Sequence, residues 1–118
     1  MEARELVAEL QAAIDASDSE RLRLLFEDGA VLVGSSADAR NPDALRAYLD
    51  AVAAGDPFRW ELDDYVVFHD EGGELGFAAF GEVVQGDRRA PFRMTIFAVE
   101  TYGGWRIRHF HGSIPADL

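Results

Sequence analysis

The second half of the sequence is composed largely of residues that favour β-strands, and this half constrains the fold most. After Pro57, Phe58, Trp60 and Leu62 alternate with charged residues, which is the pattern of a strand with one face buried. Glycine-containing turns separate this segment from three further strand patterns, which favours consecutive antiparallel pairing. Four long strands are predicted, over residues 58–68, 75–84, 90–101 and 105–111.

The first half of the sequence has helical periodicity instead. Leu6, Leu10 and Ile14 recur at helical spacing and predict a helix over 3–16. A second short helix is predicted up to about Phe26, and a short strand follows at 30–33. Asn41 and Pro42 are a helix cap and a first helical residue, so a third helix is predicted from 42 to about 54.

This order of elements predicts an α+β fold. Helices that precede a run of antiparallel strands cover one face of the sheet. We expect a cone-shaped, curved antiparallel sheet packed against three N-terminal helices, with an internal pocket between the two layers. Gly76, Ala79 and Gly81 are small residues on a central strand and could leave room for that pocket.

The bulk composition limits the classes of function. With 118 residues, we expect one domain over 1–118. The formal net charge of −11 disfavours binding to nucleic acid or to an anionic membrane surface. There is no cysteine, which excludes thiol chemistry, and no apolar segment has the length of a membrane span. The N-terminus has none of the features of a signal peptide, so a cytoplasmic protein is predicted.

Three stretches of the sequence resemble a known family. They are Leu22–Val31, Asn41–Leu49 and Gly104–His111, and together with the order of elements they resemble the SnoaL-like family of the nuclear transport factor two-like (ketosteroid isomerase-like) superfamily. The third stretch is also similar to the closing strand of the association domain of calcium/calmodulin-dependent protein kinase II. The resemblance implies the cone fold, an internal pocket and a homodimer that forms through the sheet face.

The catalytic residues of the ketosteroid isomerases in this superfamily are absent from the matching positions. The aspartate base of the ketosteroid isomerases falls near Gly34, their tyrosine falls near Leu10, and the late strand 91–99 contains no acid. Steroid-type isomerisation by that route is therefore not expected. The pocket arginines of the kinase association domain match Ile96 and Gly112, which predicts a more apolar pocket that does not hold a small carboxylate in that way.

His109 and His111 are the candidate catalytic residues. A two-residue turn at Gly103-Gly104 would pair Ala98 with His109 and Ile96 with His111, and would place both imidazoles on the concave face. Histidine in a pocket can act as a general acid or base near neutral pH. The alternative is that both imidazoles are hydrogen-bonded residues of the core or of an interface. A His-X-His pair needs a third ligand to hold a metal, and none has diagnostic spacing, so neither a metal nor a cofactor is predicted.

The candidate ligand-binding residues are apolar or aromatic and are expected to line the pocket. They are Leu10, Ile14, Tyr48, Trp60, Phe77, Met94, Ile96 and Trp105.

Two hypotheses of function follow from these expectations. In the first, the pocket binds a small apolar or aromatic metabolite, and His109 and His111 assist an isomerisation, cyclisation or hydration. In the second, the chain is a non-catalytic dimerisation or assembly domain with a vestigial pocket, and an outer sheet face with Phe97, Val99 and Phe110 meets a second copy. A homodimer is expected in both hypotheses.

Overall fold

A computed structural model of the chain describes residues 1–35 and 37–115. The described residues form three helices and six strands, which follow the predicted α+β order except that the short β2 was not predicted. In chain order they are α1 (Ala3–Asp15), α2 (Ser19–Leu24), β1 (Phe26–Val33), β2 (Asp38–Ala39), α3 (Pro42–Ala54), β3 (Arg59–Glu71), β4 (Glu74–Gln85), β5 (Arg88–Thr101) and β6 (Gly104–Ser113). None of the helices in the described part of the chain is long and apolar enough to cross a membrane.

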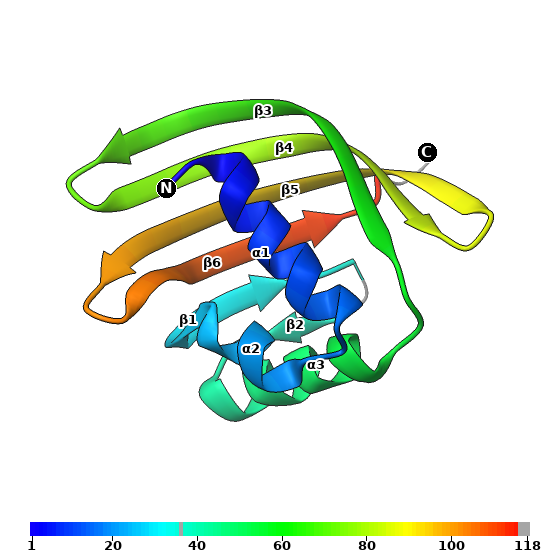
Figure 1. Ribbon diagram of the computed structural model, residues 1–118, viewed down its shortest axis with the longest axis horizontal. Coiled ribbons are helices and arrows are strands. Elements are labelled where there is room, and N and C mark those ends of the chain that lie inside the picture. Colours follow the sequence, from blue (N-terminus) through cyan, green and yellow to red (C-terminus); the bar gives the residue numbers. More distant parts are fainter. Residues whose placement is uncertain (36, 116–118) are drawn as a thin grey trace.

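The strands form one curved sheet in the order β2-β1-β6-β5-β4-β3. Strands β3 to β6 are the predicted antiparallel series, and Figure 1 shows them bending around the helices. Strand β1 adds to the sheet beside β6 and runs parallel to it, and the short β2 pairs with β1. The helices lie on the concave face, and no helix or strand of residues 1–35 and 37–115 covers the convex face (Figure 1).

Local signals set the starts of two helices. The side chain of Asp18 accepts a hydrogen bond from the backbone N–H of Arg21 at 3.0 Å and caps α2. Asn41 caps α3 in the same way, through the N–H of Ala44 at 2.9 Å.

The end of the second helix was predicted two residues too late. The helix ends at Leu24, and Phe26 is the first residue of β1 rather than part of the helix. The Leu25 carbonyl accepts a hydrogen bond from the N–H of Ile107 at 2.7 Å. This pairing with β6 is a tertiary interaction, and it outweighs the local helical propensity of the segment.

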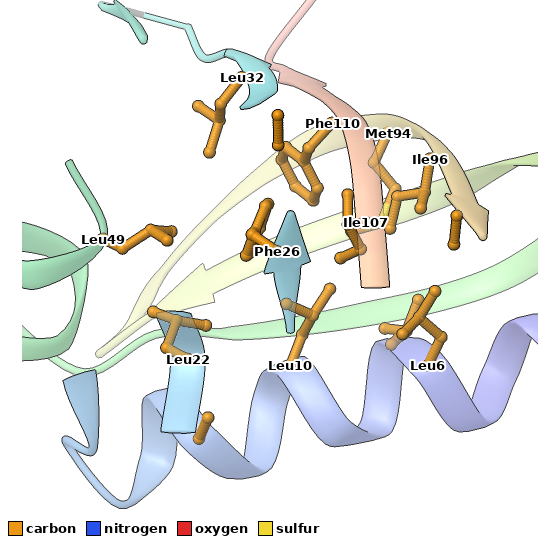
Figure 2. Close-up of a cluster of buried hydrophobic side chains, with 14 of the residues drawn as sticks. Leu6, Leu10, Leu22, Phe26, Leu32, Leu49, Met94, Ile96, Ile107 and Phe110 are labelled. Carbon is orange, nitrogen blue, oxygen red and sulfur yellow. The ribbon is translucent and has the colours of Figure 1, made fainter. Parts of the chain in front are cut away.

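The core lies between the helices and the concave face of the sheet. Leu6 and Leu10 of α1 point toward Ile107 and Phe110 of β6, and Figure 2 shows Leu22 and Phe26 beside them. Leu6 and Ile107 are fully buried. Each such side chain contributes roughly 1.5–3 kcal/mol when it is removed from water. This packing holds α1 against the concave face of the sheet.

A β-bulge in β6 changes which side chains face the core. Ala98 pairs with Ile107, but the next pair is Phe97 with His109, so Arg108 is an extra residue. Because successive strand residues point to opposite faces, one extra residue moves His109 and His111 to the convex face. The predicted pairs Ala98–His109 and Ile96–His111 are wrong for this reason. The observed pairs are Ala98–Ile107 and Ile96–Phe110.

The same bulge changes which residues of β6 lie on the outer face of the sheet. Phe110 was assigned to that face, but it is 9% exposed and belongs to the core on the concave side. Phe97 does lie on the convex face, where its ring packs against the ring of His69 with a centroid distance of 5.8 Å. Val99 is two residues from Phe97 on the same strand and shares this face.

Candidate ligand-binding site

A cavity of about 430 Å³ lies between the helices and the sheet. All three helices contribute to its wall, together with residues of β1, β3, β4, β5 and β6. Its volume falls within the range of about 300–1,000 Å³ that is common for small-molecule pockets. Its surface is mainly apolar. The described part of the chain therefore contains a mainly apolar cavity of a size suited to a small molecule.

The burial of the lining residues shows where the cavity opens. At the inner end Leu10, Leu22 and Phe26 are buried. At the other end Ser35 and Arg88 are exposed. The cavity thus runs from the core to an opening between the β4–β5 hairpin and the segment that follows β1.

Trp60 organises the aromatic wall of the cavity. Its ring lies 5.5 Å from the ring of Phe58, 6.2 Å from that of Phe92 and 6.3 Å from that of Phe110, measured between centroids. All four rings line the cavity. Such tilted and edge-on arrangements stabilise aromatic clusters beyond the area that they bury. A flat apolar molecule in the cavity would contact aromatic rings on several sides.

Gln11 of α1 fixes the segment that carries Trp60. Its side-chain amide donates a hydrogen bond to the carbonyl of Phe58 at 3.0 Å, and its Oε1 accepts one from the N–H of Trp60 at 2.9 Å. The same amide nitrogen donates to Asp15 at 2.9 Å. One side chain therefore satisfies two backbone groups at the start of β3 and holds the aromatic wall against α1.

Tyr48 brings a hydroxyl group to the cavity. It lies on the inner face of α3, and burial raises the pKa of its phenol above the usual 10.0, so the group stays protonated at neutral pH. Its Oη makes no hydrogen bond to other described residues and is free to meet a ligand. Gly34 leaves space for it, because a Cβ at position 34 would collide with the Tyr48 hydroxyl.

The structure divides the eight predicted ligand-binding residues into two groups. Leu10, Ile14, Tyr48 and Trp60 line the cavity. The other four were expected to line it but do not: they are Phe77, Met94, Ile96 and Trp105. The first three of these are buried in the core, where α1 packs directly on the sheet and leaves no space, and Trp105 is half-buried at the start of β6.

All three histidines of the chain lie on the convex face of the sheet, away from the cavity. His109 pairs with Phe97 and His111 pairs with Thr95, and neither lines the cavity. His69 lies 3.1 Å from Glu74 through its Nε2. Among residues 1–35 and 37–115 no three His, Cys, Asp or Glu side chains are close enough to hold a metal ion.

Sequence reasoning missed several residues of the site. Phe26, Phe92 and Phe110 belong to the aromatic wall, and Gln85 and Arg88 lie at its opening. Phe92 has the same strand parity as Met94 and Ile96, so the alternation along β5 could have revealed it. Phe110 could not be found in this way, because the bulge at Arg108 reverses the alternation.

Comparison with known proteins identifies the family of the chain and shows which solved structures share its fold. Residues 3–117 match a family described as the SnoaL-like domain. A search of curated protein sequences found no match.

Solved structures share the fold at low sequence identity. An NTF2-like protein of unknown function from Pseudomonas putida KT2440 has a TM-score of 0.81 and 20% identity, over 98% of this chain and 85% of the other. A candidate dehydratase of the NTF2-like family from Streptomyces avermitilis has a TM-score of 0.83 and 15% identity, over 97% and 94%. A candidate scytalone dehydratase from Novosphingobium aromaticivorans DSM 12444 has a TM-score of 0.80 and 12% identity, over 96% and 81%.

Proposed function

Because the chain belongs to the SnoaL-like domain family, we propose that it binds a small apolar or aromatic metabolite inside its cone. The observation that carries this proposal is the cavity of about 430 Å³ with the aromatic wall around Trp60. An apolar cavity with few polar groups is the usual form of a small-molecule site. Burial of apolar ligand surface against the wall would supply most of the affinity.

The chemistry of the lining favours binding over catalysis. Among the described residues that line the cavity there is no carboxylate and no imidazole. Tyr48 supplies a phenol to the lining, and its raised pKa makes it a weak proton donor at neutral pH. Two similar structures are named as candidate dehydratases. His109 and His111 lie on the convex face, and this position does not support a catalytic role for them in the cavity.

Native mass spectrometry tests whether the cavity holds a ligand. The protein is incubated with an apolar small-molecule extract of the expression host, and its spectrum is compared with one recorded under denaturing conditions. We expect an added mass that disappears on denaturation. A Val52→Trp variant should lose this mass, because Val52 lines the cavity and the larger side chain fills it.

Val66→Trp is the matched control for this experiment. Val66 is 49% exposed on β3 and does not line the cavity, so the same substitution there should leave the added mass unchanged. An added mass that survives in Val52→Trp, or that disappears in both variants, would contradict the proposed location. If the wild-type spectrum showed no added mass, the proposed binding of an apolar metabolite from that extract would be contradicted.

A second candidate function is self-association through the convex face. Val66, Phe68 and Phe80 are between 42% and 59% exposed there, and Phe97 lies between them and β6. A contiguous exposed apolar patch is typical of an interface. We propose that a second copy of the chain covers it, because the same patch on two copies can meet across the two-fold axis of a closed dimer.

Sedimentation equilibrium tests the dimer. Phe68→Glu places a charge on the convex face, whereas Val67→Glu places the same charge one residue away, at a position that pairs with Phe77 and points to the other face. We expect wild type and Val67→Glu to be dimers and Phe68→Glu to be monomeric. A monomeric wild type, or a dimeric Phe68→Glu variant, would contradict this assignment.

A further inference from the structure

Arg88 and Arg89 are consecutive residues at the start of β5, and their side chains have opposite surroundings. Residues at alternate positions of β5, such as Ala90 and Phe92, line the cavity, and Arg88 shares their strand parity. Arg89 has the opposite parity, and its guanidinium group contacts Glu61 and Glu82. Both arginines are among the residues that line the cavity, but only the guanidinium group of Arg89 is held by carboxylates.

The guanidinium group of Arg89 makes three hydrogen bonds to carboxylates. Its Nη1 lies 2.9 Å from one carboxylate oxygen of Glu61 and 3.2 Å from Glu82, and its Nη2 donates to the other oxygen of Glu61 at 3.3 Å. These contacts lower the pKa of Glu61, chiefly through the hydrogen bond from Arg89 and then through that from Arg59. Arg88 has no carboxylate within ion-pair distance in the described part of the chain.

The polar groups around the opening can all donate hydrogen bonds. Gln85 pairs with Arg88 across the β4–β5 hairpin, and both line the cavity. Tyr48 adds a protonated hydroxyl group from α3. The described lining contains no carboxylate that would repel an anion. This set of donors, next to a deep apolar wall, matches a ligand with an apolar body and an acceptor group at one end.

We propose that the ligand of this cavity is an apolar carboxylic acid, whose ring lies against Trp60 and whose carboxylate contacts Arg88 and Gln85 at the opening. This inference rests on the proposed binding function and adds the chemical class of the ligand. A chain with a net charge of −11 repels anions in general, so binding of an anion here requires a local cation. Arg88 supplies that cation.

Isothermal titration calorimetry with two matched probes tests this inference. 2-Naphthoic acid has an aromatic body with a carboxylate, and 2-naphthamide is its neutral counterpart of nearly the same shape. We expect wild-type protein to bind the acid more tightly than the amide. Arg88→Ala should weaken binding of the acid about 3- to 10-fold, a modest loss because the guanidinium group is exposed, and should leave binding of the amide unchanged.

Arg46→Ala is the control for net charge. Arg46 is an exposed arginine of α3 that pairs with Asp43 and does not line the cavity, so its removal should change neither affinity. Equal binding of acid and amide, with no effect of Arg88→Ala, would overturn the inference but support the binding function. Equal losses of affinity for the acid in Arg88→Ala and Arg46→Ala would overturn the proposed contact between Arg88 and the carboxylate. Binding of neither probe to wild type would contradict the binding function as well.

Discussion

The hydroxyl group of Tyr48 occupies the space that a Cβ atom on Gly34 would need. Tyr48 lies on α3 and Gly34 follows β1, so this contact joins a helix to the edge of the sheet at the cavity opening. A Cβ at position 34 would also lie 3.0 Å from the carbonyl of Ala37. A side chain at position 34 would therefore force Tyr48 or the Ala37 carbonyl to move.

Gly34→Ala should destabilise the protein by about 1–3 kcal/mol, the usual effect of an added group in a packed site. The free energy of unfolding is measured with urea. Tyr48→Phe in the same chain removes the colliding oxygen and should recover part of the loss. A Gly34→Ala variant as stable as wild type, or a loss that Tyr48→Phe does not relieve, would contradict the contact.

Gln11→Ala should destabilise the protein by about 1–3 kcal/mol. The substitution leaves the carbonyl of Phe58 and the N–H of Trp60 without the partners that Gln11 provides. Glu9→Ala on the exposed side of α1 is the control and should change stability by less than about 0.5 kcal/mol. Hydrogen exchange of the Trp60 amide is the second measurement. It should accelerate in Gln11→Ala, and an unchanged rate would argue against the fixing role of Gln11.

The carboxyl group of Glu61 should titrate below the usual value of 4.5, because Arg89 and Arg59 stabilise its charged form. A lowered pKa in the folded state contributes stability above the ordinary value, and this contribution is lost as the pH falls through the folded pKa. Carboxyl-carbon NMR measures the titration. Arg89→Ala should raise the Glu61 pKa toward 4.5, whereas Arg88→Ala should leave it unchanged. Equal shifts in both variants would contradict the assignment of the Glu61 contact to Arg89 rather than Arg88.

His109→Ala and His111→Ala should leave ligand affinity unchanged, since both side chains lie on the convex face. The calorimetric titration with 2-naphthamide measures this. If either substitution weakened binding about tenfold without loss of structure, the placement of the cavity on the concave side would be contradicted.

Much of the fold could be predicted from the sequence because its signals are local. The spacing of Leu6, Leu10 and Ile14 predicted α1, and Asn41-Pro42 predicted the start of α3. The alternation after Pro57 predicted four antiparallel strands. The parallel pairing of β1 with β6 is a long-range contact that brings residue 26 beside residue 107, and local periodicity carries no information about it.

The site was predicted less well, and one residue explains much of the error. The bulge at Arg108 reverses the facing of every later residue of β6, so Phe110 enters the cavity wall and the two histidines leave it. The other errors come from packing. Met94 and Ile96 have the right facing, but α1 fills the space above them, and the cavity forms only toward the other end of the cone.

Methyl NMR with small aromatic probes tests the central claim, the binding of a small apolar molecule inside the cone, most directly. Leucine, isoleucine and valine methyl groups are labelled, and naphthalene derivatives are added. We predict shifts at Leu10, Leu49 and Val52, which line the cavity, and none at Val66 on the convex face. Shifts confined to the convex face, or no shift with any probe at millimolar concentration, would contradict the account.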